Sequence, residues 1–166
     1  MSTTEVQAQT KSRNERFTQL QRTLVLVKPD AVQRGLIGNI ISRFESRGLA
    51  LVGLKLLKMD NGRAAKLYEP HLGRPFYDSL VNYMTSGPIV ALALEGVNAI
   101  AVARKMMGAT NPSEAEPGTI RGDFAQRVDF NCVHGSDSAE NAQRELPIFF
   151  ETAELVSHDP SYTFWL

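Results

Sequence analysis

One histidine of the sequence, His134, lies where an imidazole can react. It follows the apolar run from Val128 to Val133, which is typical of a buried strand, so we expect His134 at the end of a strand. Gly135 lets the backbone turn or a ligand come close, and Ser136 and Asp137 offer side chains that can orient the ring. The chemistry that this arrangement indicates is nucleophilic attack by the imidazole.

Phosphoryl transfer would use such a nucleophile together with groups that neutralise the charge of the phosphates. Lys28 follows an apolar run, Arg104 lies on a predicted helix, and Thr110 and Arg121 lie on a long loop without a regular pattern. They can supply cations and a hydroxyl to phosphate oxygens. Each of them taken singly is more often a solvated surface group, so only convergence in space would indicate a site.

Other chemistries fit the sequence less well. Ser136, Asp137 and His134 resemble a hydrolase triad on paper, but they lie within four residues of one another and no Gly-x-Ser-x-Gly motif is present. The sequence also lacks a phosphate-binding P-loop and a Gly-x-Gly-x-x-Gly dinucleotide motif. Any phosphate site is therefore expected to consist of side chains.

The elements that must position these residues are predicted in the order βαββαβ. The predicted strands are 23–27, 49–59, 88–94 and 128–133, and the predicted helices are 37–48, 60–71, 75–83, 97–107 and 138–146, the last one ended or kinked by Pro147. Asp60 is the predicted N-cap of the second helix. This order predicts an α+β fold, a ferredoxin-like βαββαβ antiparallel sheet with helices packed on one face.

Composition limits the classes of protein. The chain has 166 residues, a length typical of one domain, and its 18 Lys and Arg balance 18 Asp and Glu, so nucleic acid is not expected as the main partner. The single cysteine, Cys132, cannot form an internal disulfide. The sequence shows neither a secretory signal nor a run of about 18 apolar residues for a membrane helix. We therefore expect a cytoplasmic protein without a membrane partner.

Over residues 23–156 the chain resembles the nucleoside diphosphate kinase family. The resemblance is carried by Val27 to Asp30 with Gln33 to Gly35, Arg74 to Phe76, Ser86 to Pro88, Thr110 to Pro112 with Gly118 to Asp123, and Asn131 to Ser138. It implies a ferredoxin-like core and ping-pong transfer of the γ-phosphate of a nucleoside triphosphate to a nucleoside diphosphate through a phosphohistidine. Residues 1–22 are expected to form a mobile polar tail, and the apolar end of 157–166 could pack at a subunit interface.

The resemblance also implies roles for single residues around the nucleophile. His134 matches the phosphorylated histidine, Glu145 the carboxylate that hydrogen-bonds its ring, and Ser136 a hydroxyl that assists near it. Lys28 and Tyr68 match the pair that contacts the transferring phosphate. An ordinary position on the helix surface is the alternative for Glu145.

Further positions match residues that bind the rest of the nucleotide. Arg104, Thr110 and Arg121 match the clamp on the remaining phosphates, and Asn131 with Lys28 matches the groups that hold the ribose 3′ hydroxyl. Phe76 matches the aromatic ring that stacks on the base, with Val128 and Leu80 on the other side; simple core packing is the alternative for Phe76 and Val128.

Cofactor and assembly follow from the same resemblance. Mg²⁺ is expected to bind mainly through the nucleotide phosphates, so no protein ligand for the metal is predicted. The family forms hexamers or tetramers, so a homo-oligomer is expected. A different class of function, a nucleotide-binding regulatory protein that keeps the fold without turnover, is less favoured because every matched site position is intact.

Overall fold

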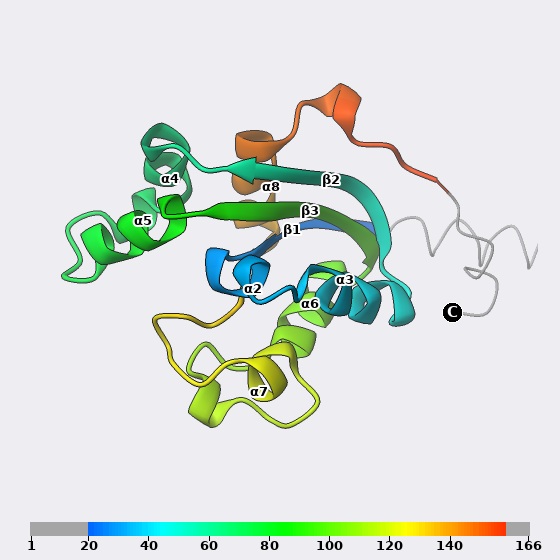
Figure 1. The fold of residues 1–166 in the computed structure, drawn as a ribbon. Helices are drawn as coiled ribbons and strands as arrows, with labels where there is room; N and C mark the ends of the chain where they lie inside the picture. Colours follow the sequence, from blue (N-terminus) through cyan, green and yellow to red (C-terminus); the bar gives the residue numbers. More distant parts are fainter. Residues whose placement is uncertain (1–19, 159–166) are drawn as a thin grey trace, which may run out of the picture.

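The computed structural model describes residues 20–158, which form a four-stranded antiparallel sheet surrounded by helices (Figure 1). The strands lie in the order β2-β3-β1-β4, with bounds β1 Leu20–Val27, β2 Ala50–Lys58, β3 Pro88–Val97 and β4 Val133–Gly135. This order confirms the predicted α+β, ferredoxin-like arrangement. The central strands β1 and β3 pair along their whole length, from Leu20 with Val97 to Val27 with Val90.

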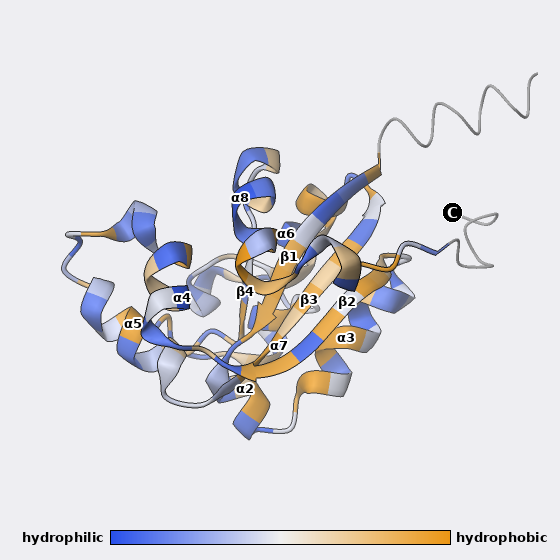
Figure 2. Cartoon of the chain, turned by 90° about the horizontal axis from the view of Figure 1, so that it is seen from above, coloured by the Kyte–Doolittle hydropathy of each residue, from blue (hydrophilic) through white to orange (hydrophobic). Residues whose placement is uncertain are grey.

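The apolar run of β1 is buried on both faces of the sheet. Val25 and Val27 point into one core and Leu24 and Leu26 into another, because successive side chains of a strand point to opposite faces. Figure 2 shows the strands as the most hydrophobic part of the chain. Burial on both faces explains why β1 has a continuous apolar sequence rather than an alternating one.

Helices cover both faces of this sheet. Their bounds are α2 Pro29–Gln33, α3 Ile37–Ser46, α4 Asn61–Leu67, α5 Tyr77–Thr85, α6 Ala99–Met107, α7 Ile120–Phe124 and α8 Ala139–Phe149, with short 3₁₀ turns at Glu69–His71, Pro112–Glu114 and Thr152–Glu154. The helices α3 and α6 pack on the face of Val25 and Val27, whereas α4, α5 and α8 cover the opposite face. The prediction of helices on one face holds for α3 and α6 and is wrong for the other three, whose apolar residues pack in the core of Leu24 and Leu26. In Figure 1 α8 lies behind the strands, and α4 and α5 extend beyond one end of the sheet.

Local capping fixes where two of the helices begin. The Asp60 carboxylate accepts a hydrogen bond from the Arg63 N–H, which confirms the predicted N-cap of α4. The Ser138 hydroxyl accepts one from the Asn141 N–H and begins α8 directly after β4. Because α8 begins so close to β4, its first turns lie beside the strand that carries His134.

The predicted bounds of the fourth strand are wrong. The prediction was 128–133, whereas β4 is Val133–Gly135, so His134 lies within the strand and pairs with Leu26. The reason is Cys132, whose φ of 67° interrupts the extended backbone, while Val128 and Phe130 are exposed rather than buried. The apolar composition of 128–133 suggested a strand that the backbone does not form.

Of the two alternatives predicted for Pro147, that it ends or that it kinks the last helix, the first is wrong. Pro147 lies inside α8, which continues to Phe149. Phe149 is buried in the core with Leu146, and this packing outweighs the hydrogen bond that proline cannot donate.

Some predictions fall outside the described residues. The polar tail and the C-terminal segment lie mostly in 1–19 and 159–166, which the structure does not describe. Within the described part of the chain, no helix is both long and apolar enough to span a membrane.

Phe44 provides a test of the α3 packing. Replacing Phe44 by Ala removes a fully buried ring of the core, and we expect the free energy of unfolding to fall by about 3–5 kcal/mol. Urea denaturation followed by circular dichroism measures this loss. Val156→Ala truncates an exposed apolar side chain and should change stability little; equal effects of the two substitutions would contradict the assigned core.

Candidate active site

The pairing of β1 with β4 brings Lys28 close to the segment that carries His134. Lys28 follows β1 directly, and its backbone N–H donates to the Cys132 carbonyl at 2.8 Å. Its ammonium Nζ donates to the Asn131 Oδ1 at 2.7 Å. The Asn131 amide in turn donates to the Thr110 carbonyl at 2.9 Å, which connects the long loop to this network.

Lys28 is a buried cation without a carboxylate at salt-bridge distance among the described residues. Burial, and then repulsion by the Arg121 guanidinium, lowers the pKa of Lys28 to about 8. Such a group favours an anionic ligand, because a phosphate would restore the stabilisation of the ammonium that water provides elsewhere.

The His134 ring is held by a carboxylate on one of its two nitrogens. Because Leu26 and His134 face each other across the antiparallel pair, the imidazole lies on the sheet face that α8 covers. Nε2 lies 3.1 Å from the Glu145 Oε2 of α8. If Nε2 carries the proton, Nδ1 keeps its lone pair, and the side chain is 22% exposed. The arrangement leaves Nδ1 without a hydrogen-bond partner within residues 20–158, so this nitrogen can act as the nucleophile.

Glu145 is buried and receives three different side chains. Its Oε2 accepts the Ser136 hydroxyl at 2.6 Å as well as His134, and its Oε1 accepts Arg144 at 3.3 Å. Burial alone would raise the pKa of Glu145, but the hydrogen bond and charge of His134, then Ser136 and Arg144, outweigh it and lower the pKa. Glu145 is therefore a carboxylate at neutral pH, and Ser136 acts on His134 through it.

Tyr68 lies beside this pair with a free hydroxyl. Its ring meets the His134 ring edge-on, with centroids 6.3 Å apart. The hydroxyl is buried and has no hydrogen-bond partner among the described residues, which is uncommon for a native polar group. Burial, and then the charge of Glu145, raises the pKa of Tyr68, so the phenol stays a donor. A donor held in this way suits an oxygen of a bound phosphate.

The three predicted phosphate-clamp residues lie in different surroundings. Arg121 is buried and donates to the carbonyls of Gly108, Asn131 and Val133, so its guanidinium holds the backbone of the site together. Burial, and then the charge of Arg104, lowers the pKa of Arg121 to about 10. Thr110 is exposed on the loop that Asn131 anchors.

The residues predicted to hold the base lie farther out. Phe76 is 48% exposed, and its ring lies 5.5 Å from that of His71, which lies 6.3 Å from Tyr68. Leu80 packs partly against the core formed with α4, α5 and α8, and Val128 is exposed before β4. Neighbouring rings therefore connect Phe76 through His71 and Tyr68 to His134. Leu80 and Val128 are not part of this series of rings.

Sequence reasoning missed Asp30 and Tyr83. The Asp30 Oδ2 accepts the Cys132 backbone N–H at 3.2 Å, and its Oδ1 accepts the hydroxyl of Tyr83 from α5. The signal that could have found Asp30 is its position, two residues after Lys28 at the end of a buried strand. Nothing in the sequence pairs it with Tyr83.

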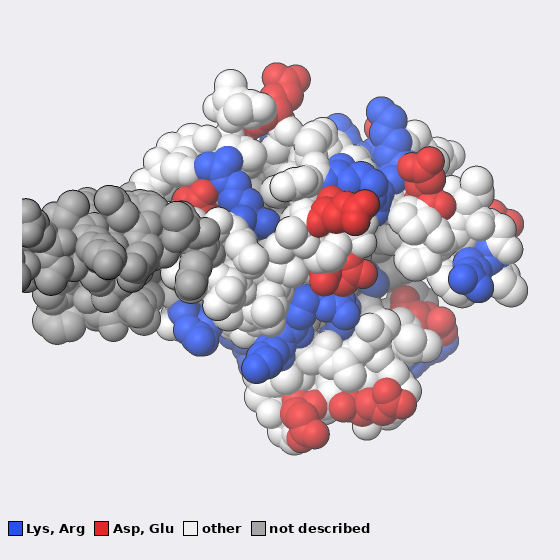
Figure 3. All heavy atoms as spheres, turned by 180° about the vertical axis from the view of Figure 1, so that it is seen from behind, with Lys and Arg blue, Asp and Glu red and all other residues white. Residues whose placement is uncertain are grey.

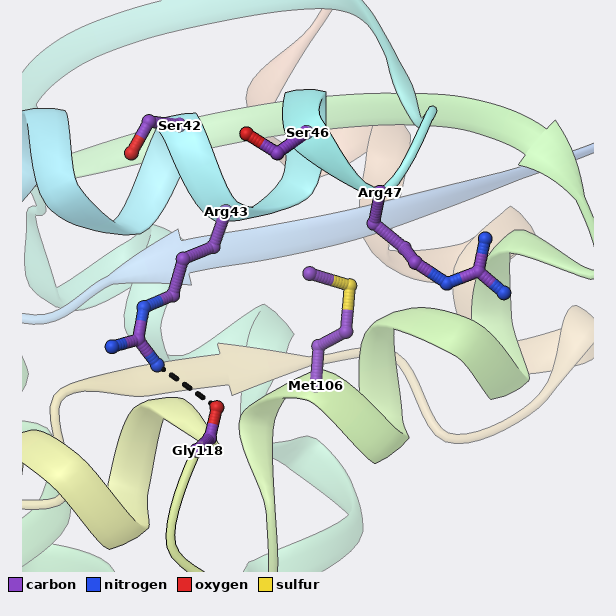
Figure 4. A pocket seen from close by; sticks show the side chains of 6 residues that line it. All are labelled: Ser42, Arg43, Ser46, Arg47, Met106 and Gly118. Carbon is purple, nitrogen blue, oxygen red and sulfur yellow. Dashed lines mark hydrogen bonds between the residues drawn. The ribbon is translucent and has the colours of Figure 1, made fainter. Parts of the chain in front are cut away.

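Charges of both signs are mixed on the face that Figure 3 shows, and one cavity lies away from the site. Figure 3 shows Lys and Arg interspersed with Asp and Glu on the face opposite that of Figure 1. The cavity of about 400 Å³ is lined by α3, the end of α6 and Gly118, and no predicted site residue lines it (Figure 4). Among residues 20–158, no three His, Cys, Asp or Glu side chains lie close enough together to hold a metal ion.

Ser136 provides a test of the carboxylate network. In Ser136→Ala the pKa of Glu145 rises, because the variant loses a hydrogen bond that favours the ionised form. We expect the free energy of unfolding at pH 7 to fall by about 1–3 kcal/mol. The lowered pKa of Glu145 makes its contribution complete above the unfolded value of 4.5 and lost as the pH falls through the folded value, so the deficit narrows in acid.

Urea denaturation at several pH values and NMR titration of the Glu145 carboxyl measure these effects. Ser42→Ala removes an exposed hydroxyl that donates to a carbonyl of its own helix and serves as the control. A deficit that is independent of pH would contradict the coupling between Ser136 and Glu145.

Comparisons with known proteins agree with this geometry. Residues 21–155 match the family model described as nucleoside diphosphate kinase. A nucleoside diphosphate kinase of Thermosynechococcus vestitus is 54% identical over 147 residues, which cover 89% of this chain and 98% of the relative.

Two solved structures have the same fold. A halophilic nucleoside diphosphate kinase from Halobacterium salinarum in complex with CDP is 45% identical with a TM-score of 0.85, covering 87% of this chain and 97% of that one. A transition-state mimic of the Borrelia burgdorferi enzyme with vanadate and ADP is 38% identical with a TM-score of 0.84, covering 87% and 95%. The chain belongs to the nucleoside diphosphate kinase family.

Proposed function

We propose that this chain is an active nucleoside diphosphate kinase that transfers the γ-phosphoryl group through Nδ1 of His134. The observation that carries the proposal is the contact of Glu145 with Nε2, which leaves Nδ1 as the nucleophile. The names of the relatives and the vanadate complex of the Borrelia burgdorferi enzyme support phosphoryl transfer as the reaction.

The reaction consists of two half-reactions, and each forms one bond to phosphorus and breaks another. The lone pair of Nδ1 attacks the γ-phosphorus, and the bond from that phosphorus to the oxygen bridging it to the β-phosphate breaks, releasing a nucleoside diphosphate. The terminal β-phosphate oxygen of a second diphosphate then attacks the phosphohistidine, and the phosphorus–nitrogen bond breaks. The Glu145 carboxylate stabilises the positive charge that the ring develops on attack.

Cations and two hydroxyls receive the phosphates in this proposal. Lys28 and Tyr68 contact the transferring group, since the Lys28 ammonium is held by Asn131, three residues before His134, and the Tyr68 ring meets that of His134. Arg104, Thr110 and Arg121 bind the remaining phosphates. Three carbonyls already occupy donors of Arg121, so it binds phosphate with its remaining N–H groups.

The rest of the nucleotide lies between the network and the exposed ring. Asn131 and Lys28 hold the ribose 3′ hydroxyl, and the base stacks on Phe76, with Leu80 and Val128 completing its surroundings. Stacking accepts every base because each has a π-face. Mg²⁺ would be held by oxygens of the nucleotide phosphates rather than by side chains of residues 20–158, and it would neutralise part of the phosphate charge.

A nucleotide-binding regulator without turnover is the competing function. It explains the fold, but it does not require a carboxylate on His134, a buried lysine bound to Asn131, or a buried tyrosine hydroxyl that has no hydrogen-bond partner in residues 20–158. The mixed charge of the surface in Figure 3 likewise does not favour nucleic acid as the main partner.

His134→Ala tests the covalent step. Incubation of the wild-type protein with ATP and Mg²⁺ should add one phosphate mass to the peptide that contains residue 134, and a nucleoside diphosphate chase should remove it. His134→Ala should gain no mass and lose turnover by at least about 10³-fold, because no other group replaces the nucleophile. His158→Ala, in which an exposed histidine is removed, is the control. Normal turnover of His134→Ala would refute the proposal.

The lowered pKa of Lys28 predicts a pH dependence. Because the folded pKa is about 8, the free enzyme loses the ammonium charge as the pH rises through that value. We expect the second-order rate of phosphorylation by ATP to fall about tenfold per pH unit above it. Rapid-quench measurements between pH 6 and 10 test this. A rate that stays constant to pH 9.5 would show that the charge of Lys28 is not required.

We also propose that the chain forms a homo-oligomer, with the open edge of β2 as a contact. The sheet order leaves one edge of β2 unpaired, although the Val156 N–H donates to the Val52 carbonyl there. Leu54 and Leu56 are exposed on this strand, Leu56 to 67%. Exposed apolar residues on an edge strand are typical of a protein interface.

Leu54→Lys with Leu56→Lys tests this contact. We expect the double variant to lower the assembled mass, because the lysines bring like charges to the strand edge. Light scattering during gel filtration measures the mass. Leu72→Lys, which changes another exposed leucine, is the control. An unchanged mass in the double variant would move the interface elsewhere.

A further inference from the structure

We infer that Asp30 is a positioning residue that holds the turn before His134 and the helix α5 in fixed relation to Lys28. The inference rests on the proposed function, because it assigns Asp30 a role in presenting the nucleophile. The proposed function assigns Asp30 no contact with the nucleotide.

The two carboxylate oxygens of Asp30 serve different parts of the chain. Oδ2 accepts the backbone N–H of Cys132 at 3.2 Å. Oδ1 accepts the hydroxyl of Tyr83, which lies on α5, 53 residues away in sequence. Asp30 itself lies in the first turn of α2, two residues after Lys28. One side chain therefore links three segments that meet at the site.

Cys132 is the position that needs such support. Its φ is 67°, a backbone conformation that residues other than glycine rarely adopt, and the residue is fully buried. Its N–H is held by Asp30 and its carbonyl by the Lys28 N–H. Cys132 directly follows Asn131, which binds the Lys28 ammonium, and precedes the strand of His134. A change of this turn would move both groups.

Tyr83 transmits the same support to the base side. It lies on α5, which begins directly after Phe76, and its ring packs edge-on against Phe130 with centroids 5.0 Å apart. Burial, and then the hydrogen bond with Asp30, raises the pKa of Tyr83, so the hydroxyl remains a donor. The Lys28 ammonium lies 6.0 Å from the centre of this ring. The bond to Asp30 therefore fixes α5 relative to the cation.

Geometry and charge predict different effects of substitution. The negative charge of Asp30 also raises the pKa of Lys28, against the larger effects of burial and Arg121. Asparagine keeps an oxygen for the Cys132 N–H and a nitrogen that can donate to the Tyr83 oxygen, but it has no charge. Alanine removes both contacts, and Tyr83→Phe removes only the second.

Single-turnover phosphorylation of the full chain by Mg²⁺-ATP tests the inference. Asp30→Ala should lower the phosphorylation rate at saturating ATP at least tenfold, because the turn before His134 relaxes. Asp30→Asn should stay within about threefold of wild type at pH 7. Tyr83→Phe should raise the ATP concentration for half-maximal rate severalfold and leave the maximal rate within twofold. Glu45→Ala, which removes an exposed carboxylate on α3, should change neither.

Rescue distinguishes positioning from general destabilisation. Glycine adopts a positive φ without strain, so Cys132→Gly should restore the maximal rate of Asp30→Ala to within about threefold of Cys132→Gly alone. Lost packing of the buried thiol would lower the melting temperature of both glycine variants without preventing this rescue. If Asp30→Ala does not fold, the Asp30→Asn and Tyr83→Phe rates decide the inference by the values given above.

Four results would overturn the inference. The first three concern Asp30: a wild-type rate for Asp30→Ala, an equal loss in Asp30→Asn and Asp30→Ala, and an undiminished effect of Asp30→Ala in the glycine background. The fourth is an unchanged ATP concentration for half-maximal rate in Tyr83→Phe. None of them affects the proposed function, which fails if the wild-type protein gains no phosphate, or if His134→Ala still becomes phosphorylated or still turns over.

Discussion

The short pairing between β1 and β4 is the constraint on which the rest of the site depends. Only three residues of β4 pair with β1, from Val25 with Gly135 to Val27 with Val133. That pairing sets Lys28 beside Cys132 and turns the His134 ring toward α8. Because β1 is buried on both faces and also pairs with β3, the partner of β4 is among the most rigidly held parts of the chain. His134 pairs with Leu26 of β1 and is therefore held in the same rigid part of the sheet.

Electrostatics in the site is unbalanced in the absence of an anion. The buried cations Lys28 and Arg121 repel each other, and burial lowers the pKa of both. Carbonyls and an amide oxygen satisfy their hydrogen bonds without neutralising their charge. Glu145 is the buried carboxylate here, and it is already engaged by His134 and Ser136. Burial therefore keeps the pKa of both cations lowered, although the Asp30 carboxylate raises that of Lys28.

The same site stores backbone strain and distributes its support. A positive φ at a residue other than glycine costs on the order of 1–3 kcal/mol, and at Cys132 the contacts of Asp30 and Lys28 offset that cost. The Arg121 guanidinium also donates hydrogen bonds to the carbonyls on either side of this residue, those of Asn131 and Val133. Several hydrogen bonds thus determine the path of the backbone between Asn131 and His134, where a small displacement would misplace the nucleophile.

The sequence by itself determined the fold class, the order of helices and strands along the chain, and the family. Continuous apolar runs, helical spacing and cap residues such as Asp60 are local signals, and they specify elements whose order leaves few topologies. Motifs such as Val27 to Asp30 also identified the residues to examine, and the family resemblance gave Glu145 and Tyr68 their predicted roles.

Only the tertiary structure decided how these residues meet. The sequence misplaced β4 because the positive φ at Cys132 depends on Asp30, whose contact is 102 residues away in the chain. The sequence did not determine which ring nitrogen of His134 contacts Glu145. It also did not indicate that the Tyr68 hydroxyl lacks a hydrogen-bond partner among the described residues, or that Arg121 donates hydrogen bonds to three carbonyls. No pattern in the sequence indicates that Tyr83 contacts Asp30. Each of these facts depends on contacts between segments distant in sequence, and a periodic pattern carries information only about the segment in which it occurs.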